Sequence, residues 1–224
     1  MNKNNKKRMR ITTILLKTLS LVSILIVYSC DTDETQTVAT FSNLTMADEF
    51  DVEGAPNSEI WNFDIGTGPN LDGWGNNELQ YYTDRSENVT VQNGLLVITA
   101  IEEDYNGSSH TSAKLITKGK FSQAYGRFEA RIKVPGGSGL WPAFWLLGEN
   151  VDVDGWPQCG EIDIMEYRRQ EPTKVSGSIH GPGYSGLTDP QGQVTKSYDL
   201  GNDRYDADFH IFGIEWGPEY INYY

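Results

Sequence analysis

Short strand-like segments separated by turn residues run through most of this sequence, and no long stretch carries a helical apolar period. Such segments lie at 95–99, 126–134 and 174–180. Asn93-Gly94 and Gly217-Pro218 are dipeptides typical of the turns between strands. Residues 41–224 are enough to bury a core. We therefore predict one all-β domain over 41–224, with the architecture of an antiparallel β-sandwich.

Residues 1–29 have the composition of a secretory signal peptide. They contain six of the 18 Lys and Arg residues and none of the 31 acids, and 11–27 is apolar except for Lys17 and some Ser and Thr. A membrane-spanning anchor is the alternative. It is disfavoured because a span needs about 20 apolar residues and this shorter run contains a lysine.

The apolar run ends at Val27-Tyr28-Ser29-Cys30, which resembles a bacterial lipoprotein processing site. Cys30 is therefore the predicted lipidation site, and the polar, acidic residues 30–40 form a predicted flexible tether. We expect a secreted lipoprotein at the outer membrane or cell surface, or facing the periplasm. Its contact with the membrane would be the lipid alone, and we expect a monomer.

Charge excludes nucleic acid as a partner. Beyond residue 29 the chain has 12 basic and 31 acidic residues, a formal net charge of −19. The aromatic content of 12% instead favours ring stacking against a neutral polymer. The two cysteines are Cys30 and Cys159, so lipidation of the first would leave no disulfide framework.

Three carboxylates lie on one predicted strand within 159–167. Side chains of a strand alternate between faces, so Glu161 and Asp163 share one face and the isoleucines that follow each of them share the other. Glu166 breaks this alternation. A β-bulge at Met165 would return Glu166 to the acid face, and such bulges are common beside active sites.

A bulged strand of this kind would bring the Glu161 and Glu166 carboxyls to about 5 Å from each other. Carboxyls about 5 to 5.5 Å apart are typical of retaining glycosidases. Asp163 would raise the proton affinity of its neighbours and share a proton with the nucleophile. The alternatives are a solvated strand face or a carboxylate cluster that holds Ca²⁺.

Aromatic and polar residues elsewhere suit sugar binding. A predicted strand at 141–147 places Trp141 and Trp145 on one face as a sugar platform; the alternative is that both are core residues. His180 shares a polar face with two serines and would bond a substrate or an acid; a structural role is the alternative. The segment 73–82 is rich in amides and aromatics, which turn chemistry also explains.

Over about 45–224 the sequence resembles glycoside hydrolase family 16, of the laminarinase (endo-1,3-β-glucanase) type. The resemblance rests on GWGNNELQYYT at 73–83, KGKFSQAYGRFEARIKVP at 118–135, GLWPAFWLLG at 139–148, GEIDIMEY at 160–167 and SIHGPGYSG at 178–186. It implies a jelly-roll, concanavalin-like sandwich with a concave substrate cleft. Members continue for several strands past 220–224, so it also implies that C-terminal strands lie outside this sequence.

The resemblance also implies residue roles. Glu161 would be the nucleophile, Glu166 the acid/base and Asp163 the assisting acid. The residues that would line the sugar sites are Asn77, Lys118, Trp141, Trp145 and His180. No cofactor is required and no catalytic metal is expected. The acidic segment 48–51 resembles the start of members that hold a structural Ca²⁺ on the convex face.

The leading hypothesis is a retaining glycoside hydrolase that cleaves internal β-1,3-glucosidic bonds of laminarin-type glucans by double displacement. One alternative keeps the chemistry and changes the polymer to agar, carrageenan or mixed-linkage glucan. Carrageenan would need basic residues to meet its sulfates, and the candidate segments offer mainly Lys118. A non-catalytic glucan-binding module is the other alternative, and it would be expected to lose one or both glutamates.

We predict that Cys30→Ala abolishes lipidation and moves the protein from the membrane fraction to the soluble fraction, because the thioether-forming cysteine is lost. Metabolic labelling with a fatty acid and membrane fractionation measure the change. Unchanged processing and fractionation would refute the predicted anchor.

Overall fold

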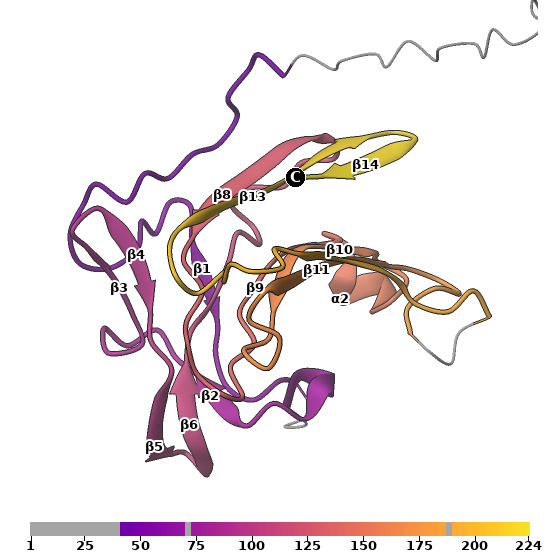
Figure 1. The fold of residues 1–224 in the computed structure, drawn as a ribbon. Coiled ribbons are helices and arrows are strands. Elements are labelled where there is room, and N and C mark those ends of the chain that lie inside the picture. The colour runs from indigo at the N-terminus through magenta and orange to yellow at the C-terminus, as the bar shows by residue number, and fades with distance from the viewer. Residues whose placement is uncertain (1–40, 70–72, 187–189) are drawn as a thin grey trace, which may run out of the picture. The chain divides into compact units, whose positions relative to one another are not determined.

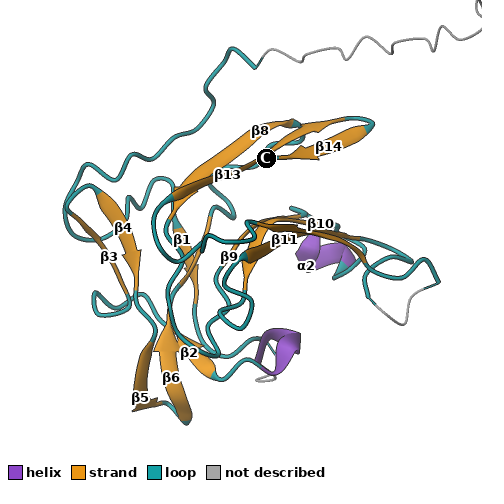
Figure 2. Cartoon of the chain, viewed as in Figure 1, coloured by secondary structure: helices purple, strands orange, loops and turns teal. Residues whose placement is uncertain are grey.

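Short strands make up most of the regular structure in the computed structural model, which describes residues 41–69, 73–186 and 190–224 (Figures 1 and 2). The predicted signal peptide, tether and lipidated Cys30 lie outside the described residues. Among the described residues, no helix is long and apolar enough to cross a membrane. Cys159 is a free cysteine.

The first half of the domain contributes small sheets. Strands β2 and β5 flank β6, β3 pairs with β4, and β1 pairs with β7. The elements are β1 (Asn62–Asp64), the irregular helical turn η1 (Gly73–Asn77), β2 (Gln80–Tyr82), β3 (Val89–Gln92), β4 (Leu95–Ile98), β5 (Ile101–Tyr105), β6 (Ser108–Ser112) and β7 (Lys114–Ile116).

The second half contributes two larger sheets. One has the strand order β12-β11-β10-β9 and the other β14-β13-β8. The elements are β8 (Gly126–Ile132), β9 (Ala143–Leu147), the short helix α2 (Val151–Asp154), β10 (Glu161–Tyr167), β11 (Lys174–His180), β12 (Val194–Asp199), β13 (His210–Gly217) and β14 (Tyr220–Tyr223).

The main core lies between these two sheets, which Figure 1 shows as separate layers. Strand β10 contributes four residues to this core, two of them consecutive, and β13 contributes two from the opposite layer. The buried cluster comprises Val134, Ile162, Ile164, Met165, Tyr167, Tyr205, Phe212 and Ile214. Burial of large side chains is the dominant stabilising term in such a sandwich. The opposite face of β10 is thereby left for polar residues.

The predicted strands at 95–99, 126–134 and 174–180 correspond to β4, β8 and β11. The turn at Asn93-Gly94 joins β3 to β4, and both residues have positive φ, 54° and 72°. That geometry is the type I′ turn that Asn-Gly favours in hairpins, because its twist matches that of the strands. The prediction of an all-β, largely antiparallel fold is confirmed.

Two details differ from the predictions. The strand expected at 141–147 begins at Ala143; Pro142 has no N–H for the ladder, although its carbonyl accepts a hydrogen bond from Tyr167 N at 3.2 Å. In addition, β2 and β6 pair in parallel. A parallel pair requires a long crossover, and the β3–β5 segment supplies it.

Candidate active site

Strand β10 places its three acids against defined partners on both neighbouring strands. On β11, Glu161 pairs with His180 and Asp163 with Ser178. On β9, Asp163 pairs with Trp145. Residues paired directly across antiparallel strands lie on the same face of the sheet. The register therefore assembles one polar face on which the acids, His180, Ser178 and Trp145 meet.

The predicted bulge is present on β10. Between Asp163 and Glu166 the strand advances three residues while β11 advances two. Met165 pairs with Phe144 of β9, so Ile164 is the residue without a β9 partner. Ile164 and Met165 are consecutive and both buried in the core cluster. The bulge thus absorbs one extra apolar residue and returns Glu166 to the face of Asp163.

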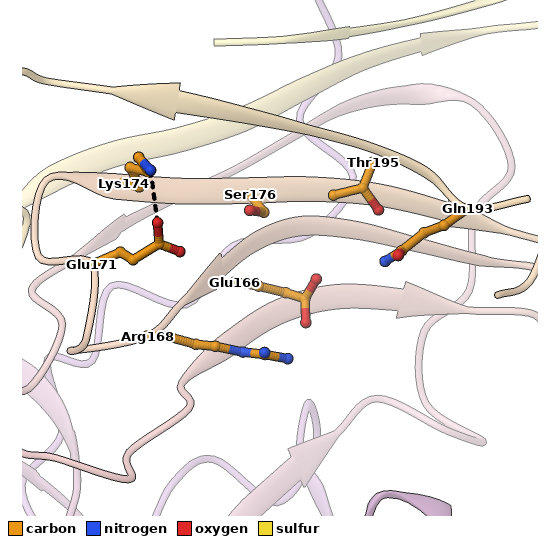
Figure 3. Close-up of a pocket in the computed structure, with 7 residues that line it drawn as sticks. All are labelled: Glu166, Arg168, Glu171, Lys174, Ser176, Gln193 and Thr195. Carbon is orange, nitrogen blue, oxygen red and sulfur yellow. Dashed lines mark hydrogen bonds and ion pairs between the residues drawn. The ribbon is translucent and has the colours of Figure 1, made fainter. Parts of the chain in front are cut away.

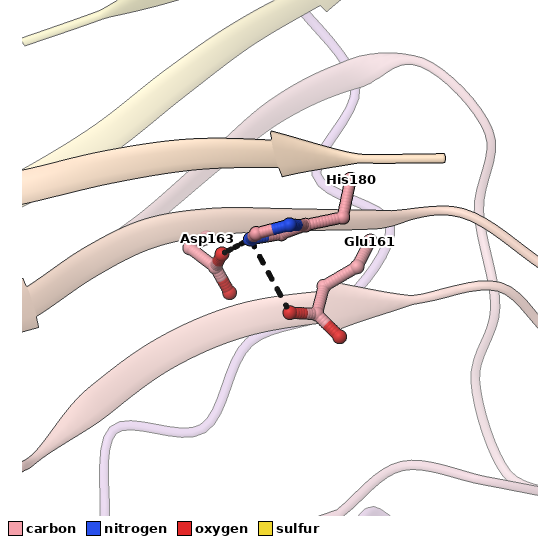
Figure 4. Close-up of side chains that lie close together, drawn as sticks. All are labelled: Glu161, Asp163 and His180. Atoms are coloured by element: carbon pink, nitrogen blue, oxygen red, sulfur yellow. Dashed lines mark hydrogen bonds and ion pairs between the residues drawn. The ribbon is translucent and has the colours of Figure 1, made fainter. Parts of the chain in front are cut away.

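The imidazole of His180 lies between two acids (Figure 4). Its Nε2 is 3.1 Å from Asp163 Oδ2 and 3.9 Å from Glu161 Oε1. Its Nδ1 is 3.0 Å from the carbonyl oxygen of Ser185. A carbonyl only accepts, so Nδ1 carries hydrogen and Nε2 is directed at the carboxyls. The prediction that His180 bonds an acid is confirmed.

Asp163 is 5% exposed, and this burial is the main cause of its shifted titration. Desolvation, followed by the charges of Glu161 and Glu166, raises the pKa of Asp163 to about 8. Burial also raises the pKa of Glu161, but His180 and a hydrogen bond from Asp163 oppose that rise. Asp163 therefore retains a proton near neutral pH, and this proton supplies its hydrogen bond to Glu161.

Glu166 is oriented by two donors from different parts of the chain. The indole N–H of Trp141 donates to Glu166 Oε1 at 2.9 Å, and Ser178 Oγ donates to Oε2 at 3.3 Å. Ser178 is itself within 2.9 Å of Thr195 Oγ1. These bonds define the direction in which the Glu166 carboxyl faces, which a group that transfers a proton requires.

A pocket of about 170 Å³ adjoins Glu166, and neither Glu161 nor His180 is among its lining residues. Figure 3 shows Glu166 at its wall, with Arg168 beside it and the Glu171–Lys174 ion pair at one end. The lining residues are Glu166, Arg168, Glu171, Lys174, Ser176, Gln193 and Thr195. The pocket is polar and holds both signs of charge, so it suits a hydroxylated group beside Glu166.

The two predicted platform tryptophans have different environments. Trp141 precedes β9, is 39% exposed, and has the Arg168 guanidinium 4.7 Å from its ring centre. Trp145 is half-buried, and its neighbours Phe144 and Leu146 pack against the core. The alternation of faces along β9 is therefore as predicted. Sugar binding by either ring stays a prediction.

Two further residues that the sequence analysis did not single out, Lys114 and Trp156, belong to this region. Lys114 Nζ lies 4.2 Å from the ring centre of Trp74 and 5.1 Å from that of Trp145, and it pairs with Asp64 at 3.0 Å. Trp156 is 50% exposed, and its ring centre is 6.0 Å from that of His180. Trp156 stands five residues before Glu161 in the sequence. Its closeness to the acid strand is the feature by which the sequence could have indicated it.

Two predicted positions, Lys118 and Asn77, lie away from the acids' own contacts. Lys118 forms an exposed ion pair with Asp152 of α2 at 2.5 Å. Asn77 is exposed at the end of η1 with φ 57°. Their roles in sugar binding stay predictions.

The segment predicted to hold structural Ca²⁺ is partly engaged in local hydrogen bonds. Asp48 accepts from Trp61 Nε1 at 2.8 Å and from the amide of Phe50 at 3.0 Å. Glu49 and Asp51 are exposed carboxylates of this segment, and a calcium ion takes oxygen ligands of that kind. A calcium ion there stays a prediction.

Comparison with known proteins identifies the family. The family model for Glycosyl hydrolases family 16 matches residues 75–224. The chain is 40% identical over 219 residues to the beta-glucanase of Rhodothermus marinus, across 96% of this chain and 74% of that protein. It is 41% identical over 183 residues to a glucan endo-1,3-beta-glucosidase of Cryptopygus antarcticus, across 79% of this chain and 63% of that protein.

Comparison of the structure with solved structures agrees with the family match. The structure matches the X-ray structure of the laminarinase from Rhodothermus marinus with a TM-score of 0.74 and 42% identity, across 81% of this chain and 70% of that chain. The chain therefore belongs to glycosyl hydrolases family 16. The predicted resemblance and the jelly-roll fold are confirmed; the roles of individual side chains stay predictions.

We predict that Asp163→Asn gains stability relative to wild type as pH rises from about 4 to 8. The Asp163 carboxyl ionises near pH 4 when unfolded but at about 8 when folded. Between these values the folded wild type binds more protons than the unfolded chain, so its stability falls with pH. Asparagine does not titrate in this pH range, so the variant does not share this fall in stability. Urea unfolding at several pH values measures the difference, and a difference that stays constant across this window would contradict the assignment.

Proposed function

We propose that this protein is a retaining glycoside hydrolase that cleaves internal β-1,3-glucosidic bonds of laminarin-type glucans. The observation that carries the proposal is the bulged strand β10, which presents Glu161, Asp163 and Glu166 on one face. The similar proteins named as beta-glucanase, glucan endo-1,3-beta-glucosidase and laminarinase support the choice of substrate. The chain covers 63% of the second of these, so the activity of the whole protein is part of the proposal.

In the proposed first step the Glu161 carboxylate attacks the anomeric carbon and the bond to the leaving sugar breaks. Glu166 gives its proton to the leaving oxygen. In the second step Glu166 takes a proton from water, and the water oxygen displaces Glu161 from the same carbon. Two inversions retain the configuration. The Asp163 hydrogen bond to Glu161 would stabilise the carboxylate before attack and after its release.

Aromatic rings supply a means of binding a neutral polymer. Trp145 pairs directly with Asp163, Trp141 donates to Glu166, and Trp156 lies beside His180. Ring faces of glucose are apolar, and an indole can stack on them without removing a charged group from water. Lys114 and Lys118 are each paired with an aspartate, and the Arg168 guanidinium lies over the Trp141 ring. These engaged cations favour a neutral glucan over sulfated carrageenan.

We also infer that the protein is a bacterial lipoprotein exported and anchored through Cys30. The support is the basic start, the apolar run and the cysteine that follows it. A polysaccharide is too large to enter the cell. An enzyme that cleaves it would therefore be held at the outer membrane or cell surface, or would face the periplasm.

We predict that Glu161→Gln loses at least about a thousandfold in kcat on laminarin, because an amide cannot form the glycosyl-enzyme intermediate. Glu102→Gln changes an exposed glutamate of β5 and should keep wild-type activity. Proton NMR of the wild-type reaction should show the β anomer first. Activity of Glu161→Gln within about tenfold of wild type, or the α anomer as first product, would refute the proposal. Lichenan and agarose, tested in parallel, distinguish the polymers.

We predict that Trp145→Ala weakens laminari-oligosaccharide binding at least about tenfold while costing about 1 kcal/mol of stability, the size of a lost cation–π contact. Phe144→Ala on the core side of β9 is the matched control. It should cost about 3 to 5 kcal/mol and leave binding intact in the folded protein. Calorimetric titration in the Glu161→Gln background and urea unfolding give the two quantities. The reverse pattern would place Trp145 in the core.

A further inference from the structure

The ends of β10 and β11 bring three metal-ligating side chains together. Glu161 of β10 pairs directly with His180 of β11, and Asp163 is two residues further along β10. One ligand atom from each residue lies within 4.8 Å of the other two. Figure 4 shows the imidazole of His180 directed at both carboxyls from the neighbouring strand. Because both strands are inside a four-stranded sheet, their backbones hold these positions rigidly.

The second nitrogen of His180 is already fixed. Nδ1 donates to the carbonyl oxygen of Ser185 at 3.0 Å, which leaves Nε2 as the atom that faces the acids. A histidine that binds a metal through one nitrogen usually donates its other N–H to a carbonyl or a carboxylate. His180 has this arrangement before any ion binds, so no rotation of the ring is needed.

The distances suit a small dication. Zn²⁺ binds histidine nitrogen and carboxylate oxygen at about 2.0 to 2.2 Å in tetrahedral sites, which places ligand atoms about 3.3 Å apart. His180 Nε2 is 3.1 Å from Asp163 Oδ2 and 3.9 Å from Glu161 Oε1. A rotation of the Glu161 side chain would bring its oxygen closer to the other two ligand atoms, both of which lie within 4.8 Å of it. Its side chain is 18% exposed, so a water molecule has access as the fourth ligand.

The ligand set also selects among metals. One imidazole and two carboxylates suit zinc and its neighbours, whereas Ca²⁺ prefers six to eight oxygen ligands. Binding would release the Asp163 proton, because a metal takes the ionised carboxylate, and the dication would then offset the charge of the two carboxylates.

We propose that Glu161, Asp163 and His180 form a Zn²⁺ site that is filled only when substrate is absent, and that Zn²⁺ therefore inhibits the enzyme competitively. Coordination would occupy the Glu161 carboxylate that the proposed mechanism needs as nucleophile. The metal site follows from the geometry of the three side chains; only the inhibition rests on the proposed function.

The test measures Zn²⁺ binding directly. Calorimetric titration of wild type in the absence of substrate should show one site, and Zn²⁺ should raise the thermal midpoint, because a ligand that binds the folded state stabilises it. His180→Asn should weaken binding by about tenfold or more. His110→Gln, which changes a half-buried histidine of β6 outside the three-residue cluster, is the matched control and should bind as wild type. If His180→Asn does not fold, Asp163→Asn removes a different ligand and serves in its place.

Competition completes the experiment. A laminari-oligosaccharide should raise the apparent Kd for Zn²⁺, and Zn²⁺ should raise KM for laminarin while leaving kcat unchanged. Unaltered Zn²⁺ binding in His180→Asn, or no binding to wild type, would overturn the metal site. If Zn²⁺ binding depends on His180 but the protein hydrolyses no glucan, the metal site stands and the proposed function fails.

Discussion

The extra residue in β10 is the constraint on which the candidate site depends. A strand with strict alternation would turn Glu166 toward the core and an apolar side chain toward the acids. The bulge instead buries Ile164 and Met165 together between the two sheets, and the burial of two large side chains stabilises the irregular backbone. Packing on one face of the strand therefore positions the carboxylates on the other.

Gathering three acids on one strand face has an electrostatic cost, which the surroundings of the site reduce. His180 and the proton retained by Asp163 limit the negative charge beside Glu161. Glu166 receives two hydrogen bonds, from Trp141 and Ser178. The two glutamates thus have different environments although they lie on the same strand, and different environments are what assign an acid and a nucleophile in such pairs. The same crowding of ligand atoms suits a dication when no sugar is bound.

Several elements could be predicted because their causes are local. Asn93-Gly94 adopts positive φ at both residues without help from distant groups. The spacing of Glu161, Asp163 and Glu166 indicated a bulge, since one irregularity reconciled every side chain of the strand with a half-buried sheet. Alternation along β9 correctly separated Trp145 from Phe144 and Leu146. In contrast, the start of β9 was misplaced because proline at 142 removes a ladder hydrogen bond, an effect that the periodicity alone does not register.

The sequence by itself determined the all-β class, the bulged acid strand and the family resemblance, because alternation, turn chemistry and motifs are encoded in neighbouring residues. Tertiary structure decided which distant residues meet that strand. Lys114 contacts the rings of both Trp74 and Trp145, and Trp156 lies beside His180. These contacts depend on strand register and on loop paths between segments far apart in the chain. No local pattern specifies them, because the energy that fixes the register comes from packing of the whole core.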